Sequence, residues 1–121
     1  MDFQTAVRKG IDNIGNFEGR AGRAEFWWFV LAIWVVEVIL LGLISVIFNG
    51  GFLANTLWFI VWIIGARAYL SVGIRRLHDV NQSAWMIIFA FLGCLVIIPV
   101  IFWVQPSNPG DNQFGPPPST V

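Results

Sequence analysis

The sequence predicts an all-α membrane protein, a single domain in which three transmembrane helices follow an interfacial amphipathic helix. Its composition is the first observation behind this fold class: 57% of the 121 residues are hydrophobic and only 12% are charged. A soluble domain carries about 25% charged residues, so this chain has too few to cover a water-soluble globule. The second observation is three long apolar stretches. The third is that every basic residue falls on one side of them.

Residues 2–17 form the first predicted element, the interfacial helix. Its apolar residues recur at helical spacing, at Phe3, Val7, Ile11 and Ile14. Polar residues fall largely between them, as in a helix that lies on the surface of a bilayer. A frayed N-terminus is the alternative, because Gly10 and Gly15 weaken a helix.

Two apolar stretches follow and predict transmembrane helices over 26–48 and 52–74. Each exceeds the roughly 20 residues that a helix needs to cross a bilayer. Gly22 can cap the first helix, where Glu25 would then reach back to free backbone N–H groups. Asn49, Gly50 and Gly51 separate the two stretches and predict a turn.

The third predicted transmembrane helix covers residues 84–104, which include no charged side chain. Ser83 can cap its first turn. Residues 105–121 are rich in proline and glycine and predict a tail with no core of its own.

The basic residues predict the orientation. Four precede the first stretch and three lie at or after the end of the second, namely Arg8, Lys9, Arg20, Arg23, Arg67, Arg75 and Arg76. The positive-inside rule assigns these regions to the cytoplasm. With three spans, the N-terminus is therefore cytoplasmic and the C-terminus periplasmic in a bacterial inner (plasma) membrane.

The densest polar residues form the candidate site for a lipid or a protein partner: Arg20, Arg23, Arg75, Arg76, His78 and Asp79. Antiparallel neighbouring helices place both arginine pairs at one membrane surface, where Glu25 and Asp79 can pair with some of them. Arg75 and Asp79 are also spaced to pair along one helix. The arginines either bind anionic headgroups or an acidic partner, or only fix the topology.

Glu37 and Arg67 form a candidate intramembrane polar site. Glu37 lies about 16 Å along the first helix from Phe26, by the 1.5 Å rise per residue. A charge at that depth is costly, and such residues tend to be functional. Glu37 is either protonated and hydrogen-bonded to a neighbouring helix or part of a proton or ion site with Arg67.

The sequence offers no catalytic constellation, so we expect no enzyme, metal site or cofactor. It has one histidine, and Cys94 lies within the third apolar stretch, away from that histidine. No zinc-ligand spacing occurs. The net charge is zero, which gives no reason to expect nucleic-acid binding.

Three segments together resemble a known family. They are Asn16-Phe17-Glu18-Gly19-Arg20-Ala21-Gly22-Arg23-Ala24-Glu25-Phe26-Trp27, then Arg75-Arg76-Leu77-His78-Asp79 with Ser83 and Trp85, and finally Pro109-Gly110-Asp111-Asn112-Gln113-Phe114-Gly115-Pro116. In this order they resemble the opening, central and closing signatures of the bacterial inner-membrane group called domain of unknown function 805, the YhaH-like proteins. The resemblance implies a small polytopic inner-membrane protein without an established biochemical function. It also implies importance, but no specific role, for Gly19, Arg20, Arg23, Glu25, Trp27, Arg75, Arg76, Leu77, His78, Asp79, Asn112 and Gly115.

Two functions follow as hypotheses. The first is a non-enzymatic interaction or lipid-binding protein that uses the cytoplasmic arginines, with membrane lipids, anionic ones included, as partners. The second is an oligomer that conducts a small solute or ion through Glu37. Three helices bury little protein surface, which leaves room for a homo-oligomer or a membrane-protein partner.

Overall fold

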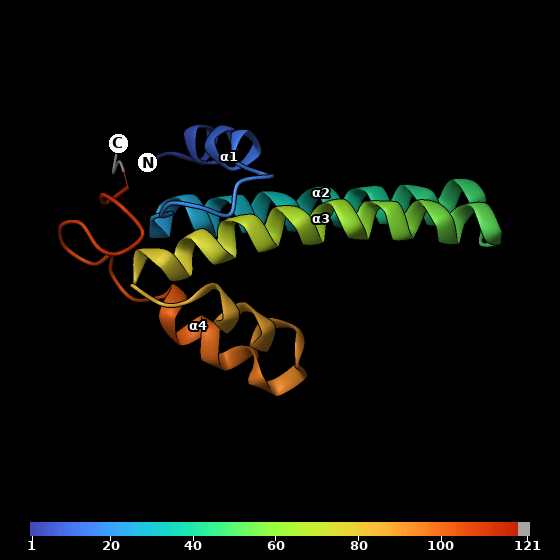
Figure 1. The fold of residues 1–121 in the computed structure, drawn as a ribbon. Coiled ribbons are helices and arrows are strands. Elements are labelled where there is room, and N and C mark those ends of the chain that lie inside the picture. The colour runs from blue at the N-terminus through green and yellow to red at the C-terminus, as the bar shows by residue number, and fades with distance from the viewer. Residues whose placement is uncertain (119–121) are drawn as a thin grey trace.

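Two long antiparallel helices are the largest elements of the molecule, and the other segments pack against them (Figure 1). The computed structural model describes residues 1–118, with α2 at Arg23–Phe48 and α3 at Phe52–Asp79. Between them, Asn49, Gly50 and Gly51 all have positive φ, at 48°, 89° and 92°. Such angles favour glycine and asparagine, so the predicted turn is confirmed. Helices cover both predicted stretches, although α2 begins earlier, at Arg23, and α3 continues past residue 74 to Asp79.

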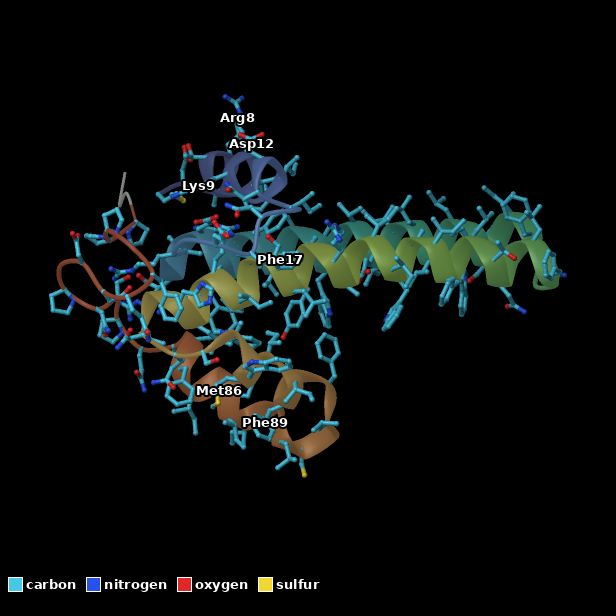
Figure 2. All side chains as sticks on the ribbon, in the orientation of Figure 1. Arg8, Lys9, Asp12, Phe17, Met86 and Phe89 are labelled. Atoms are coloured by element: carbon cyan, nitrogen blue, oxygen red, sulfur yellow. The ribbon has the colours of Figure 1, made fainter. Side chains whose placement is uncertain are left out.

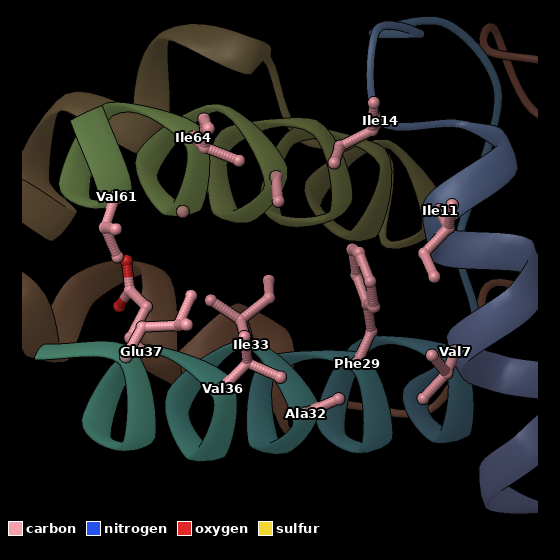
Figure 3. Close-up of a pocket in the computed structure, with 13 residues that line it drawn as sticks. Val7, Ile11, Ile14, Phe29, Ala32, Ile33, Val36, Glu37, Val61 and Ile64 are labelled. Atoms are coloured by element: carbon pink, nitrogen blue, oxygen red, sulfur yellow. The ribbon is translucent and has the colours of Figure 1, made fainter. Parts of the chain in front are cut away.

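Helix α1 (Phe3–Asp12) packs against α2 and crosses the two long helices steeply (Figure 3). The contact depends on small residues: Ala6 and Gly10 are buried, and a Cβ on Gly10 would come within 2.5 Å of Cδ1 of Phe29. Phe3 and Ile11 remain exposed. The helix is shorter than the predicted 2–17, and its apolar face is partly packed on α2 and partly exposed.

Residues 84–104 do not form the continuous helix that the sequence predicts. They form η1 (Ala84–Phe91), η2 (Gly93–Val96) and α4 (Ile97–Trp103), which fold back on one another. Gly93 has φ of +60°, which a right-handed helix cannot accommodate, and Pro99 supplies no backbone N–H. Hydropathy measures composition, and it does not detect this break. The predicted cap at Ser83 is confirmed, because its side chain accepts a hydrogen bond from the Trp85 backbone N–H.

The fold-back brings the chain to the end of the hairpin where α2 begins and α3 finishes. The Trp103 indole donates to the Gly73 carbonyl at 3.2 Å, and its ring lies 4.7 Å from that of Phe26. The Asn108 N–H then donates to the Asp79 carbonyl at 3.1 Å. Residues 105–118 therefore lie against this end, which we call the base: residues 20–30 and 68–80 with the segments packed on them (Figure 1).

The part of the hairpin farthest from the base, residues 35–64, is called the shaft here. Its side chains stand away from the helices with no other segment beside most of them (Figure 2). Large apolar side chains are exposed along it, including Val46 at 82% and Phe52 at 88%. Among residues 1–118, only α2 and α3 are long and apolar enough to cross a membrane.

Candidate functional site

Asp79 lies at the centre of a buried polar cluster in the base. Its side chain is fully buried, and Arg20 Nε donates to its Oδ1 at 3.0 Å. Arg76 Nη1 and Ser107 Oγ both donate to Oδ2. Charge-assisted bonds of this kind offset the large cost of burying the carboxylate and the two guanidinium groups.

Arg20 joins the start of α2 to the tail. Beyond Asp79, its guanidinium donates to the carbonyls of Asn108 at 2.7 Å and Gly110 at 2.8 Å. A longer bond of 3.3 Å reaches the carbonyl of Gly115. The side chain is only 6% exposed. One arginine thus holds a segment about 90 residues away in the sequence.

Arg76 closes the end of α4 in the same way. Its Nε donates to the Trp103 carbonyl at 3.1 Å, and its Nη2 donates to the Gln105 carbonyl. The last carbonyls of a helix have no partner within the helix, so the guanidinium satisfies them. Arg76 is fully buried. It fixes the position of α4 relative to α3.

A second ion pair joins α2 to α3. Arg75 Nη1 lies 2.7 Å from Glu25 Oε1, and Lys9 of α1 lies 3.6 Å from Glu25 Oε2. The predicted reach of Glu25 to the backbone at the start of α2 is not found: its Oε1 accepts from Arg75, and its Oε2 accepts no hydrogen bond. Arg75 therefore binds Glu25 rather than Asp79, and the predicted pairing of Arg75 with Asp79 is wrong.

His78 contacts the tail through its ring. The ring stacks on Phe114, with centroids 3.9 Å apart and planes 7° from parallel. Its Nδ1 donates to the Gly19 carbonyl at 3.0 Å, while Asn112 Nδ2 donates to the His78 carbonyl. The imidazole is thus held between the loop before α2 and the tail.

Five of the six predicted binding residues are therefore brought together, but they face inward. Arg20, Arg75, Arg76, His78 and Asp79 are all buried, and their charged or ring atoms contact other parts of the same chain. Arg23 is exposed, with one long contact of 3.5 Å to the Val104 carbonyl. The predicted pairing of Glu25 and Asp79 with arginines across the helix gap is confirmed.

Sequence reasoning missed the tail's part in this cluster. Ser107, Asn112 and Phe114 supply side chains, and Asn108 and Gly110 supply backbone carbonyls. The family resemblance did single out Asn112 and Gly115, but without a role. A backbone carbonyl leaves no mark in a sequence, so the carbonyl acceptors could not be predicted.

The predicted partners in the intramembrane site, Glu37 and Arg67, do not meet. Of the four ion pairs within residues 1–118, none includes either side chain. The Arg67 guanidinium lies 5.7 Å from the centre of the Phe17 ring. Glu37 lies against Gly65 of α3, where a Cβ would come within 2.6 Å of the Glu37 Cδ. The missing side chain of Gly65 makes room for the carboxylate between the two helices.

Glu37 borders a cavity of about 250 Å³ between α1, α2 and α3 (Figure 3). Apart from this carboxylate, apolar residues and Gly65 line the cavity, among them Val7, Ile11, Phe29, Ile33, Val36, Val61 and Ile64. Helix α1 covers one end of it (Figure 3). Such a lining accepts a hydrocarbon chain far better than a polar solute.

Comparison with known proteins gives the family. Residues 14–116 match a family described as "Protein of unknown function (DUF805)". The chain belongs to this family. The match spans all three signature segments, and the structure brings them into one cluster through Arg20, Asp79 and Gly110.

Two curated relatives in Escherichia coli strain K12 are similar over most of their length. The chain is 36% identical to "Inner membrane protein YhaH" over 125 residues, which cover 98% of this chain and 97% of that protein. It is 32% identical to "Inner membrane protein YhaI" over 111 residues, which cover 89% and 90%. No solved structure matches the chain.

Proposed function

We propose that this chain is a non-enzymatic, integral inner-membrane protein that binds the acyl chain of a lipid between α1, α2 and α3. Its relatives are named as inner-membrane proteins, and two of its helices are long enough to cross a bilayer. The single observation that carries lipid binding is the cavity beside Glu37, with its apolar lining. This proposal moves the lipid site away from the arginines, which the base already uses for its own contacts.

The proposed topology has two membrane spans, α2 and α3, with both termini in the cytoplasm. All seven basic residues lie in the half of the molecule that includes the base, and the turn at Asn49–Gly51 has none. The positive-inside rule therefore favours a cytoplasmic base. Residues 84–104 leave the base and return to it, so they enter the bilayer without crossing it. This topology replaces the periplasmic C-terminus expected from three spans.

Helix α1 is proposed to lie in the cytoplasmic leaflet. It crosses α2 steeply, as a helix in the membrane plane must when α2 spans the bilayer (Figure 3). Figure 2 shows Arg8 and Asp12 directed away from the hairpin. The charged face would meet headgroups while Val7 and Ile11 cover the cavity.

The position of Glu37 supports binding over conduction. A conducting oligomer would need Glu37 to line an axis shared by several copies. Instead, the carboxylate lies in the seam between α2 and α3 of its own chain, against Gly65.

Lipid binding is tested with two matched valine variants. Val36 lines the cavity, whereas Val38 on the same helix does not, and their exposed fractions are similar, at 53% and 62%. Val36→Phe should fill the cavity and lower the phospholipid that copurifies per protein in mild detergent, measured as phosphate and by native mass spectrometry. Val38→Phe should retain the native amount. Equal retention in both variants would refute the proposed site.

Topology is tested with reporters at the C-terminus and in the Asn49–Gly51 turn. We expect a C-terminal reporter to be active on the cytoplasmic side and a reporter in the turn to be active on the periplasmic side. A periplasmic signal at the C-terminus would restore three spans.

A further inference from the structure

A second cavity, of about 340 Å³, lies beside Glu37 on the side of the hairpin away from α1. Figure 1 shows α1 and the η1–α4 segment on opposite sides of α2 and α3. Four aromatic side chains line the second cavity: Trp34 of α2, Trp62 and Tyr69 of α3, and Phe91 of η1. Its volume falls in the roughly 300–1,000 Å³ range of small-molecule sites.

The rings come from three separate elements, and contacts elsewhere in the base hold Tyr69 in place. The Tyr69 ring packs edge-on against Trp103 at 5.7 Å and against Phe91 at 6.2 Å. The fold-back of residues 84–104 is what places Phe91 beside α3, since a continuous helix would carry it elsewhere. The aromatic lining is therefore a product of the tertiary structure.

Glu37 places its carboxyl group in the lining of this cavity. Gly65 makes room for it, and no cation or hydrogen-bond donor within residues 1–118 pairs with it. Arg67, two residues after Gly65 on α3, lies over the Phe17 ring instead. An ionised carboxylate beside aromatic rings favours a cationic ligand through both charge and cation–π attraction.

We infer that this cavity binds a lipophilic organic cation, such as a quaternary ammonium or phosphonium compound. Ring faces attract cations of this class, and their apolar substituents suit a cavity that opens between two membrane helices. A small metal ion fits poorly, because one carboxylate offers too few oxygen ligands. An anion would be repelled by an ionised Glu37. This site goes beyond the acyl-chain cavity, with which it shares only Ile33, Glu37 and Gly65.

Tetraphenylphosphonium is the probe, titrated by calorimetry into the full chain in nanodiscs, with empty nanodiscs to subtract partition into lipid. We expect saturable binding that weakens on the order of tenfold or more in Glu37→Gln. Trp62→Leu should weaken it by roughly three- to tenfold. Melting curves establish that each variant is folded, and Trp62→Leu keeps the test decisive if Glu37→Gln is unstable.

Three controls separate recognition of the cation from general effects. Trp58→Leu changes a tryptophan on the same helix outside the cavity lining, and Glu18→Gln removes an exposed carboxylate outside the membrane helices. Both should bind as the native chain does. The uncharged triphenylphosphine oxide should bind far more weakly than the cation. Absence of saturable binding to the native chain, equal binding of the uncharged compound, or unchanged affinity in Glu37→Gln would each overturn the inference.

Discussion

In helix α3, the charged half is buried and the apolar half is exposed. Near the base, Arg75, Arg76 and Asp79 are at most 2% exposed, while on the shaft Phe59 and Ile64 are 62% and 59% exposed. A protein folded in water shows the reverse, since charged side chains are almost never fully buried unless paired. The inversion follows if hydrocarbon surrounds the shaft and the base provides its own polar partners.

The two regions therefore depend on different forces. Specific pairs hold the base together, and removing one partner leaves another buried and uncompensated. The shaft depends on the transfer of apolar surface into lipid, which tolerates one apolar residue in place of another but not a charge. Four changes test this contrast, in order of decreasing expected effect.

The largest effect should come from Asp79→Ala. It leaves the Arg20 and Arg76 guanidinium groups without their carboxylate, at a cost of about 3–5 kcal/mol in the free energy of unfolding. Thermal unfolding in detergent measures the loss. Asp111→Ala, which changes an exposed carboxylate in the tail, is the control. Equal melting temperatures for the two variants would show that the cluster does not stabilise the base.

On the shaft, Val38→Arg should lower membrane insertion by ~2.5–3.5 kcal/mol, because its side chain faces lipid near the middle of α2. Resistance to alkaline extraction from membranes measures insertion. Val38→Leu keeps the position apolar and should insert normally. Gln113→Arg places the same charge on the exposed tail and should have no effect. Normal insertion of Val38→Arg would mean that this face meets water or protein.

Gly10→Ala should separate α1 from the base. The new methyl group would meet the Phe29 ring, and the required shift costs about 1–3 kcal/mol. Gly42→Ala is matched on the shaft, where a Cβ meets nothing within 4 Å. That variant should be stabilised by roughly 0.5–1 kcal/mol through helix propensity. Melting curves measure the stability of both variants, and hydrogen exchange measures the packing of α1. We expect faster exchange in α1 for Gly10→Ala alone.

The smallest effect concerns the start of α1. Hydrogen bonding from Thr5 to the Asp2 carboxylate lowers the pKa of Asp2. A lowered pKa in the folded state means that this cap stabilises α1 above the unfolded pKa and loses its effect as the pH falls through the folded value. Exchange of the Thr5 amide should therefore accelerate in acid. Asp2→Asn still caps the helix but does not titrate, so its exchange should lack this acid-dependent step.

The sequence alone determined the two long helices, the turn between them and the placement of all basic residues toward one end. These features depend on local composition: runs of apolar residues set the free energy of transfer to lipid, and Asn49-Gly50-Gly51 accept positive φ. The sequence also predicted that Glu25 and Asp79 lie at the same end of the hairpin as the arginines. It did not determine which arginine binds which carboxylate, because the choice depends on side-chain geometry between helices.

Only the tertiary structure decided that residues 84–104 fold back as short helices and do not form one long helix. Like a spanning helix, they include no charged residue, but Gly93 has a positive φ that interrupts the helix. Arg76, at a sequence distance of 27 residues, binds the Trp103 carbonyl and holds α4 beside α3. The same fold-back brings the tail to Arg20 and Phe91 to Tyr69. Contacts between residues so far apart depend on three-dimensional packing and on backbone carbonyls, which every residue has, so no local pattern in the sequence could specify them.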